Sequence, residues 1–190
     1  MSMKNQIEEF CRNFVLDKEG WEYRTGMFVN NTIDQVGLVI DPLWSFSADS
    51  VLTTPLVGLS HRKLASLHYK ILGKRVSWLS HIPFKNVLPN YKASGIRFYQ
   101  FGQSEMGNLE SIFNDGVKVL NQIYTGANEN ELLMNIPPQV EGAEGVKYCL
   151  VKAYLGDLEY LVKYLGGEIP VKRPVKAQDV EKILAYFSGN

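Results

Sequence analysis

The sequence predicts an α+β protein with an antiparallel β-sheet, an N-terminal helix and a C-terminal helical half. Two observations support this class. Segments with strand-like alternation and turn residues gather before residue 104, whereas apolar residues recur at helical spacing after it. The 190 residues suit a single domain. We divide it into an α/β-meander half, 1–104, and a helical half, 105–190, packed on it.

The first element is predicted to be an amphipathic helix, because four apolar residues recur at helical spacing. They are Ile7, Phe10, Phe14 and Val15. The stretch GWEYRTGMFVNNTIDQVGLVI then predicts a β-hairpin, with alternate residues from Trp21 to Val29 on one face. Asn30-Asn31 supplies its turn, and residues 33–40 form the return strand. Asp41-Pro42 ends that strand, because proline cannot donate a hydrogen bond to the next strand.

The middle of the chain predicts three strands and one helix. A strand near residues 51–54 stops at Pro55. A helix follows, with Ser60 as its N-cap and Gly73 in the left-handed position after its last turn. The stretches KRVSWLSHI and GIRFYQFGQ then predict two more strands, joined by the turn-rich PNYKASG.

The helical half predicts four or five helices. A long apolar stripe ends at Gly126, and a short helix near 129–134 stops at Pro137-Pro138. The next helix breaks at Gly156-Asp157, where Asp157 caps a second piece, and a last helix closes the chain. The apolar stripes consist of Leu109, Ile112, Phe113, Leu120 and Ile123, then Val146, Cys149, Leu150, Ala153 and Tyr154, and finally Val180, Ile183, Leu184 and Phe187.

All three histidines lie between His61 and His81. With 100° per residue, His61 and His68 fall within the apolar arc of the predicted helix. We therefore expect packed histidines, with His68 bonded to a backbone group or a tyrosine. His61 and His68 are also too far apart along a helix to chelate one metal ion as an i, i+4 pair does.

The chain is neutral overall, but its charge is segregated. Residues 50–104 contain eight bases and no acid, whereas the segments on either side are each net −4. Such a segment indicates either an anion-binding surface or pairing with the protein's own acids. Aromatic residues are interleaved with the bases, as nucleic-acid binding requires. The candidate binding residues are Arg62, Lys63, Lys70, Lys74, Arg75, Trp78 and Arg97.

Signatures of common catalytic and cofactor sites are absent from the sequence. It has no GxGxxG, GxxxxGK[ST], HExxH, GxSxG or EF-hand spacing. Cys11 and Cys149 are isolated, so we expect small buried thiols. The sequence therefore predicts no cofactor, no metal site and no catalytic residue.

The N-terminus and the apolar segments indicate a cytoplasmic protein that does not bind membranes. Glu8 and Glu9 stand where a signal peptide would have its apolar region. The longest apolar runs are far shorter than a bilayer span. The sequence does not predict an oligomeric state.

The order GWEYRTGMFV, VGLVID, TPLVGLSHRKL and a helical tail resembles small uncharacterised bacterial α+β proteins, some of which are immunity proteins of polymorphic toxins. The resemblance covers about the first hundred residues and implies a non-enzymatic protein that occludes a toxin's active site. It transfers no site residues. Many immunity proteins are markedly acidic, whereas this chain is neutral.

Three functional hypotheses follow. The first is a soluble interaction protein without catalysis that binds a protein partner, as an immunity protein does. The second is a module that binds anions or nucleic acid through segment 50–104. The third is an enzyme whose site is assembled from dispersed residues, such as His68, His81, Tyr99 and Glu105.

Overall fold

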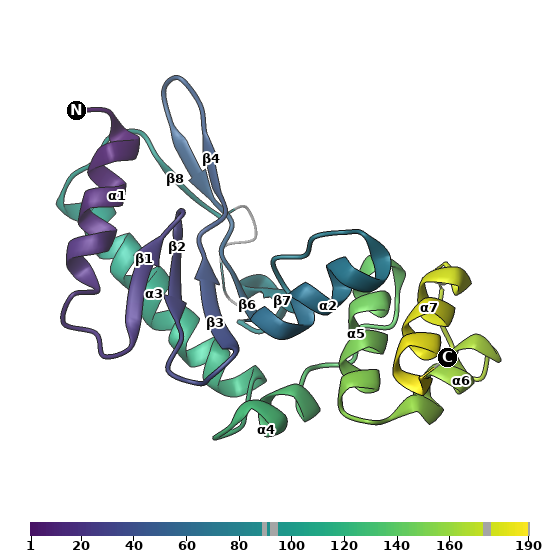
Figure 1. Ribbon diagram of the computed structural model, residues 1–190. Helices are drawn as coiled ribbons and strands as arrows, with labels where there is room; N and C mark the ends of the chain where they lie inside the picture. Colours follow the sequence, from purple (N-terminus) through teal and green to yellow (C-terminus); the bar gives the residue numbers. More distant parts are fainter. Residues whose placement is uncertain (89–90, 92–94, 173–175, 190) are drawn as a thin grey trace. The chain divides into compact units, whose positions relative to one another are not determined.

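The computed structural model describes residues 1–88, 91, 95–172 and 176–189 (Figure 1). Within these ranges the chain has seven α-helices and eight β-strands, which confirms the α+β class. The chain divides into two compact units. The first unit contains residues 1–59 and 81–123, and the second contains 60–80 and 124–190. This division differs from the expected one at residue 104, and the single-domain organisation stays a prediction.

The strands form two sheets. A five-stranded sheet has the order β1-β2-β3-β6-β7, and a three-stranded sheet has the order β4-β5-β8. The pairs β1–β2, β2–β3, β4–β5 and β5–β8 are antiparallel, as predicted. The strands span Trp21–Arg24 (β1), Met27–Asn30 (β2), Val36–Asp41 (β3), Trp44–Phe46 (β4), Val51–Thr53 (β5), Leu56–His61 (β6), Ser80–Pro83 (β7) and Ile96–Phe98 (β8).

The prediction of a two-stranded N-terminal hairpin was wrong in one respect. The structure has three strands in this segment, β1, β2 and β3, and therefore a second turn. Thr25 and Gly26 join β1 to β2 with φ angles of 49° and 85°, and Arg24 pairs with Met27 across them. Two central residues with positive φ are the type I′ arrangement that suits a two-residue hairpin loop. The alternation of apolar residues continues through this turn, which is why it was missed. The return strand accordingly begins at Val36, not at Ile33.

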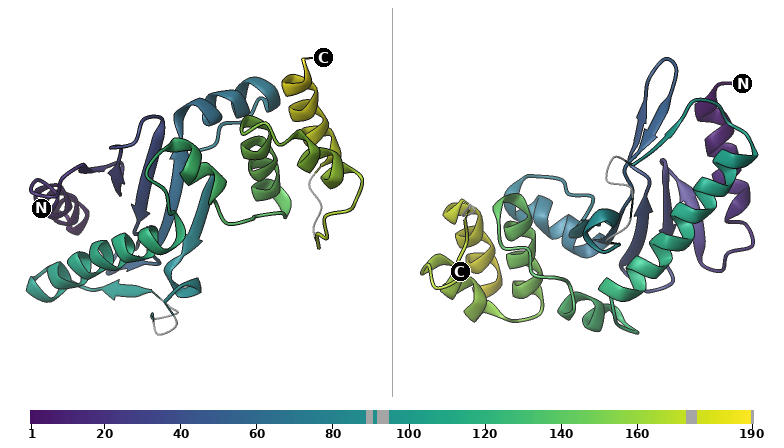
Figure 2. Two further views of the ribbon diagram at one scale, coloured as in Figure 1. Left: turned by 90° about the horizontal axis from the view of Figure 1, so that it is seen from below. Right: turned by 180° about the vertical axis from the view of Figure 1, so that it is seen from behind.

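Two helices pack in the first unit, and α3 lies along the five-stranded sheet (Figures 1 and 2). They are α1 (Met3–Phe14), with Ser2 as its N-cap, and α3 (Gln103–Ile123). Phe113 of α3 packs edge-on against three other rings, with centroids 5.3 Å from Phe14, 5.1 Å from Trp21 and 5.2 Å from Phe28. This aromatic cluster joins α1, α3 and the sheet, because edge-to-face pairs stabilise beyond the area that they bury.

The second unit is mainly helical. Helix α5 contacts α2, α6 and α7, which are grouped around it (Figure 2). Asp157 caps α6 by accepting from the Tyr160 N–H at 3.1 Å, as predicted. The helices span Arg62–Leu72 (α2), Glu129–Met134 (α4), Gly142–Tyr154 (α5), Leu158–Leu165 (α6) and Ala177–Ser188 (α7).

The predicted strand and helix ends between residues 60 and 104 need corrections. The N-cap of α2 is His61 rather than Ser60, whereas Gly73 has the predicted left-handed conformation with φ 69°. Residues 74–79 do not form the predicted strand, which begins only at Ser80. A short 3₁₀ helix covers Phe84–Asn86. The predicted turn PNYKASG lies mostly outside the described residues.

Both cysteines are buried, as predicted. Burial raises the pKa of the Cys11 and Cys149 thiols to about 12, so both stay protonated at neutral pH. They are therefore packing residues. Among the helices in the described ranges, none combines the length and apolar character that a membrane span requires.

Candidate functional site

The predicted binding residues are divided between the two units. Arg97 lies on β8 in the first unit, and the other six lie in the second unit. The acid-free segment is therefore shared by both units. The six residues of the second unit are Arg62, Lys63, Lys70, Lys74, Arg75 and Trp78.

The bases of helix α2 are exposed, whereas the two histidines are buried, as their place within the apolar arc predicted. The bases are Arg62, Lys63 and Lys70, and the histidines are His61 and His68. These bases also have neighbours within the unit. Two of them lie over tyrosine rings from other helices, Lys63 at 5.0 Å from the Tyr154 centroid and Lys70 at 5.1 Å from the Tyr186 centroid.

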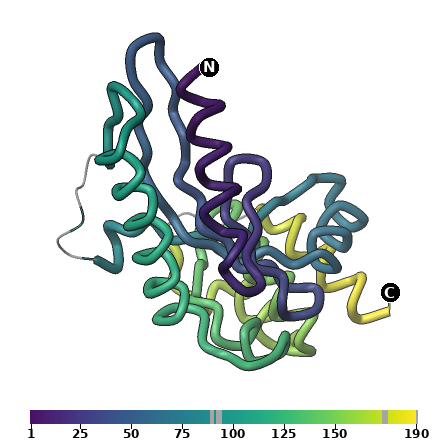
Figure 3. Tube along the Cα trace, turned by 90° about the vertical axis from the view of Figure 1, so that its left-hand side faces the viewer, coloured from purple at the N-terminus to yellow at the C-terminus, as the bar shows by residue number. Residues whose placement is uncertain are grey.

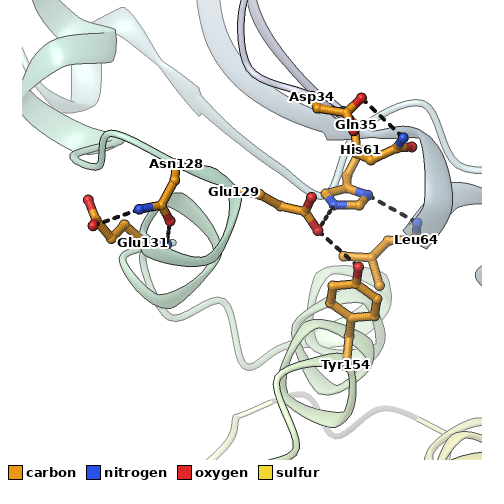
Figure 4. A network of polar contacts seen from close by, with 8 residues as sticks. All are labelled: Asp34, Gln35, His61, Leu64, Asn128, Glu129, Glu131 and Tyr154. Carbon is orange, nitrogen blue, oxygen red and sulfur yellow. Dashed lines mark hydrogen bonds and ion pairs between the residues drawn. The ribbon is translucent and has the colours of Figure 1, made fainter.

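A polar network surrounds His61 (Figure 4). Its Nε2 lies 3.1 Å from Glu129 Oε1, and the Tyr154 hydroxyl donates to the same oxygen at 2.9 Å. Its Nδ1 accepts from the Leu64 N–H at 3.2 Å. Asn128 fixes the start of α4, and therefore Glu129, by accepting from the Glu131 N–H at 3.0 Å. The network connects the start of α2 to the start of α4 and the end of α5.

The hydrogen bonds assign the protonation of His61. Because Nδ1 accepts from a backbone N–H, the proton of the neutral ring is on Nε2 and points at the Glu129 carboxylate. Burial lowers the pKa of His61, while the bond to Glu129 acts in the opposite direction. Both ring nitrogens thus have hydrogen-bond partners within the protein. We interpret the network as structural: it holds the starts of α2 and α4 and the end of α5 together.

We expect Asn in place of His61 to remove part of the pH dependence of stability. The folded-state pKa of His61 lies below the ordinary value of 6.5, so the unfolded chain takes up this proton first and stability falls as the pH drops below about 6.5. Asn still caps a helix but does not titrate. Urea unfolding between pH 5 and 7.5 should show a slope smaller by at most about 1.4 kcal/mol per pH unit. Equal slopes for the two proteins would contradict the assignment.

A cavity of about 430 Å³ opens in the second unit, next to the buried face of α2. We call it the basic cavity. Four bases and one acid line it, together with a histidine and small or apolar residues. Its lining residues are His68, Leu72, Lys74, Arg75, Val76, Gly142, Ala143, Val146, Lys147, Lys176 and Asp179.

The bases of the basic cavity are only partly neutralised. Lys74 pairs with Asp179 at 3.1 Å, and Lys147 pairs with Glu144 at 2.7 Å. Arg75 and Lys176 have no ion-pair partner among the described residues, and the Arg75 guanidinium lies 5.7 Å from the centroid of the Tyr69 ring. The charges that line the cavity therefore sum to an excess of positive charge.

Two helices begin at the basic cavity. The first two residues of α5, Gly142 and Ala143, line it, and so do Lys176 and Asp179 at the start of α7. Neither helix has a side-chain N-cap: the residues at these positions, Glu141 and Lys176, accept no bond from their helices through their side chains. The absence of a side-chain cap and the positive end of each helix dipole favour an anion there.

His68 adds a polar group to the wall of the basic cavity. Its Nδ1 lies 2.7 Å from the Lys74 carbonyl oxygen, which confirms the prediction of a bond to the backbone. A carbonyl oxygen only accepts, so Nδ1 carries the proton. For Nε2, the described part of the chain supplies no hydrogen-bond partner. The neutral ring can therefore accept a hydrogen bond from a ligand, although His68 is only 4% exposed.

The sequence identified only part of the basic cavity. Lys74 and Arg75 were among the predicted binding residues, but Lys147, Lys176 and Asp179 were not. The missed residues lie in the helical half, and only the fold brings them next to the end of α2. The sequence did contain one signal for this site. The starts of α5 and α7 both lack a Ser, Thr, Asp or Asn at the N-cap position, which leaves them without a side-chain cap.

The residues named for a dispersed enzyme site lie in different units. His68 belongs to the second unit, whereas His81, Tyr99 and Glu105 belong to the first. That hypothesis stays a prediction. Within the described ranges, no three His, Cys, Asp or Glu side chains are grouped so that they could hold a metal ion.

Comparisons of this chain with protein-family models, curated proteins and solved structures found no match. The resemblance to immunity proteins therefore stays a prediction, and the function has to be argued from the two units themselves.

Proposed function

We propose that the second unit binds an anionic ligand in the basic cavity. The observation that supports this most strongly is the convergence of four bases and the uncapped starts of α5 and α7 on one cavity. Basic side chains and free helix N–H groups are the two kinds of donor that phosphates and carboxylates bind. This proposal keeps the anion-binding hypothesis drawn from the sequence but replaces its residues. Lys74 and Arg75 are retained, and Lys147 and Lys176 are new.

The remaining lining indicates what else the ligand contains. Leu72, Val76 and Val146 form apolar wall next to the charged groups, so an apolar part of the ligand would be buried beside its anionic group. The cavity volume of about 430 Å³ lies within the ordinary range for small-molecule sites. We therefore infer a small phosphorylated or carboxylated molecule with an apolar body, rather than a nucleic acid strand.

Calorimetric titration of the full chain with phenyl phosphate tests this function. We expect it to bind more tightly than inorganic phosphate, which lacks the apolar part, and than benzyl alcohol, which lacks the charge. The affinity should fall as salt is raised from 0.01 to 0.15 M, because the Debye length shortens from about 30 Å to about 8 Å. Equal affinities for phenyl phosphate and benzyl alcohol, or no binding at low salt, would overturn the proposal.

The hypothesis of a protein partner, including an immunity function, stays a prediction. Trp, Tyr and Arg dominate the energetics of interfaces, and exposed aromatic residues are present in both units, with Tyr69 in the second and Phe46 and Tyr99 in the first. These residues do not indicate which partner they would bind. The anion function is preferred because its donors converge on a defined cavity.

A further inference from the structure

A second cavity, of about 490 Å³, lies in the first unit. It shares no lining residue with the basic cavity. Helix α1, the β1–β2 hairpin, the end of β3 and strand β4 form its walls. Figure 3 shows α1 in purple and the β4–β5 hairpin in blue, with the start of the helix and the tip of the hairpin at the same end of this unit. We call it the Asp41 cavity, after the acid in its wall.

Asp41 is a partly buried carboxylate without a counter-charge. Its Oδ1 accepts from the Leu43 N–H at 2.7 Å, and among the described residues no base pairs with it. Burial raises the pKa of Asp41 above its ordinary value, and the bond from Leu43 offsets this only in part. A desolvated carboxylate normally has a cation beside it, so this position in the wall is one that a bound cation would stabilise.

The bases that line the Asp41 cavity are directed at a different acid. Arg12 pairs with Glu8 at 3.3 Å, and Lys4 lies 3.9 Å from the other oxygen of the same carboxylate. Glu8 is thus the ion-pair partner of both bases at the α1 wall, whereas Asp41 at the end of β3 has no basic partner among the described residues. The charges that line the cavity sum to zero, and Asp41 is the one charged group of the lining without an ion pair within the described ranges.

Two aromatic side chains, Trp44 and Phe46, line the same cavity as Asp41. The Trp44 indole N–H donates to the Gly26 carbonyl oxygen at 3.0 Å, which fixes the ring, and the Phe46 ring follows at a centroid distance of 6.2 Å. Aromatic faces attract ammonium and guanidinium groups. The protein itself shows this preference, because Lys4 Nζ lies 5.9 Å from the centroid of the Phe46 ring.

The backbone around the Asp41 cavity is held in uncommon conformations. Thr25 and Leu43 both have φ of 49°, in the left-handed region that residues with side chains rarely adopt. Both line the cavity, and Leu43 is 48% exposed despite its apolar side chain. The β1–β2 turn accounts for the conformation of Thr25, so only that of Leu43 counts as strain of the kind that gathers at binding sites.

We propose that the Asp41 cavity binds the ammonium or guanidinium group of a ligand with an apolar stem. Asp41 supplies the counter-charge, Trp44 and Phe46 supply the aromatic faces, and Leu43 and Met27 contact the stem. The cation is either a free amine or guanidine, or a Lys or Arg side chain of a polypeptide. The proposal involves only the first unit and does not depend on the anion function.

Titration with n-butylguanidinium and its uncharged analogue n-butylurea tests the site. We expect the cation to bind at least ten times more tightly than the urea, and Asp41→Asn to remove this difference. Asn keeps an oxygen that accepts from the Leu43 N–H, so the backbone should keep its conformation. As a control, Asp17→Asn removes an exposed acid that pairs with Lys18 and should change nothing.

Thermal unfolding separates loss of the site from loss of the fold. The pKa of Asp41 is raised in the folded state, so its ionisation costs stability as the pH rises above 3.8. Asp41→Asn should therefore raise the melting temperature at pH 7 while it weakens cation binding. Equal binding of the cation and the urea, or unchanged cation binding by a folded Asp41→Asn variant, would overturn the proposal.

The same titration with acetyl-Gly-Arg-Gly-amide identifies the source of the cation. Binding at least ten times tighter than that of n-butylguanidinium would support the site and assign it to a polypeptide side chain. Weaker binding of the peptide, with the free cation still bound, would support the site and assign it to a small molecule. Failure of both probes would overturn it, whatever the result with phenyl phosphate at the basic cavity.

Discussion

We expect Gly116→Ala to destabilise the protein by about 1–2 kcal/mol, although alanine is the better helix former. Gly116 lies in the middle of α3, where the helix meets β3. A Cβ atom at this position would lie 2.7–2.8 Å from three side-chain atoms of Ile40. Ile40 is fully buried, so it has little room to move away. The overpacking cost should exceed the gain in helix propensity.

Gly107→Ala provides a matched control within the same helix. An added Cβ at Gly107 would have no atom within 4 Å, and the residue is exposed. Only the difference in helix propensity remains, so the free energy of unfolding of this variant should rise by about 0.5–1 kcal/mol. Urea unfolding of the two variants at pH 7 measures both effects. A stabilised Gly116→Ala variant would mean that α3 lies farther from the sheet than the structure indicates.

A double-mutant cycle with Ile40→Ala tests the cause. Ile40→Ala removes all three atoms that the new methyl group would meet, at the cost of leaving a void. The two substitutions together should destabilise by less than the sum of the single effects, because the added methyl group occupies part of that void. Additive effects would show that Gly116→Ala acts elsewhere.

The fold was predictable where local signals agree. The apolar stripe of α3 and the caps at Gly73 and Asp157 each combine residue type with spacing, and the structure confirms them. The Thr25-Gly26 turn was missed because the alternation of apolar residues does not stop there. The cap at the start of α2 was assigned to Ser60 because serine is the better intrinsic cap, but His61 also reaches Glu129. That contact joins residues 68 positions apart and leaves no local trace.

The candidate sites were less predictable than the fold. Segment 50–104 was singled out for its charge, and its members Lys74 and Arg75 line the basic cavity. Of its other bases, Lys63 and Lys70 lie over tyrosine rings, Arg62 is exposed on α2, and Arg97 lies in the first unit. A charge pattern along the chain does not show which side chains share a cavity. Asp41 illustrates the same limit, because the sequence showed it only as the end of a strand.

Charge removal at the basic cavity should reduce ligand affinity strongly. We expect the double variant Arg75→Met, Lys176→Met to bind phenyl phosphate about 100-fold more weakly, since a hydrogen bond to a charged group contributes about 1.5–3 kcal/mol. Neither base has an ion-pair partner among the described residues, so their removal leaves no acid unpaired there. Calorimetric titration at low salt measures the loss.

The double variant Lys63→Met, Lys70→Met is the control for net charge. It removes the same two charges from exposed positions of the same unit, outside the basic cavity. Its affinity for phenyl phosphate should fall by less than about threefold, because exposed charges at a distance interact weakly through the high dielectric of water. Equal losses in the two double variants would show that the ligand responds to the overall charge of the unit, not to the cavity.

Asp179→Asn should have the opposite effect. The Asp179 carboxylate lines the basic cavity and holds Lys74 at 3.1 Å, so it both repels an incoming anion and occupies one of its donors. Asparagine removes the repulsion and frees Lys74, and we expect the affinity for phenyl phosphate to rise about tenfold, the size of one favourable charge interaction near a surface. An unchanged affinity would place the anion away from Lys74. A tighter complex would show that the anion binds close enough to Asp179 to be repelled by its carboxylate.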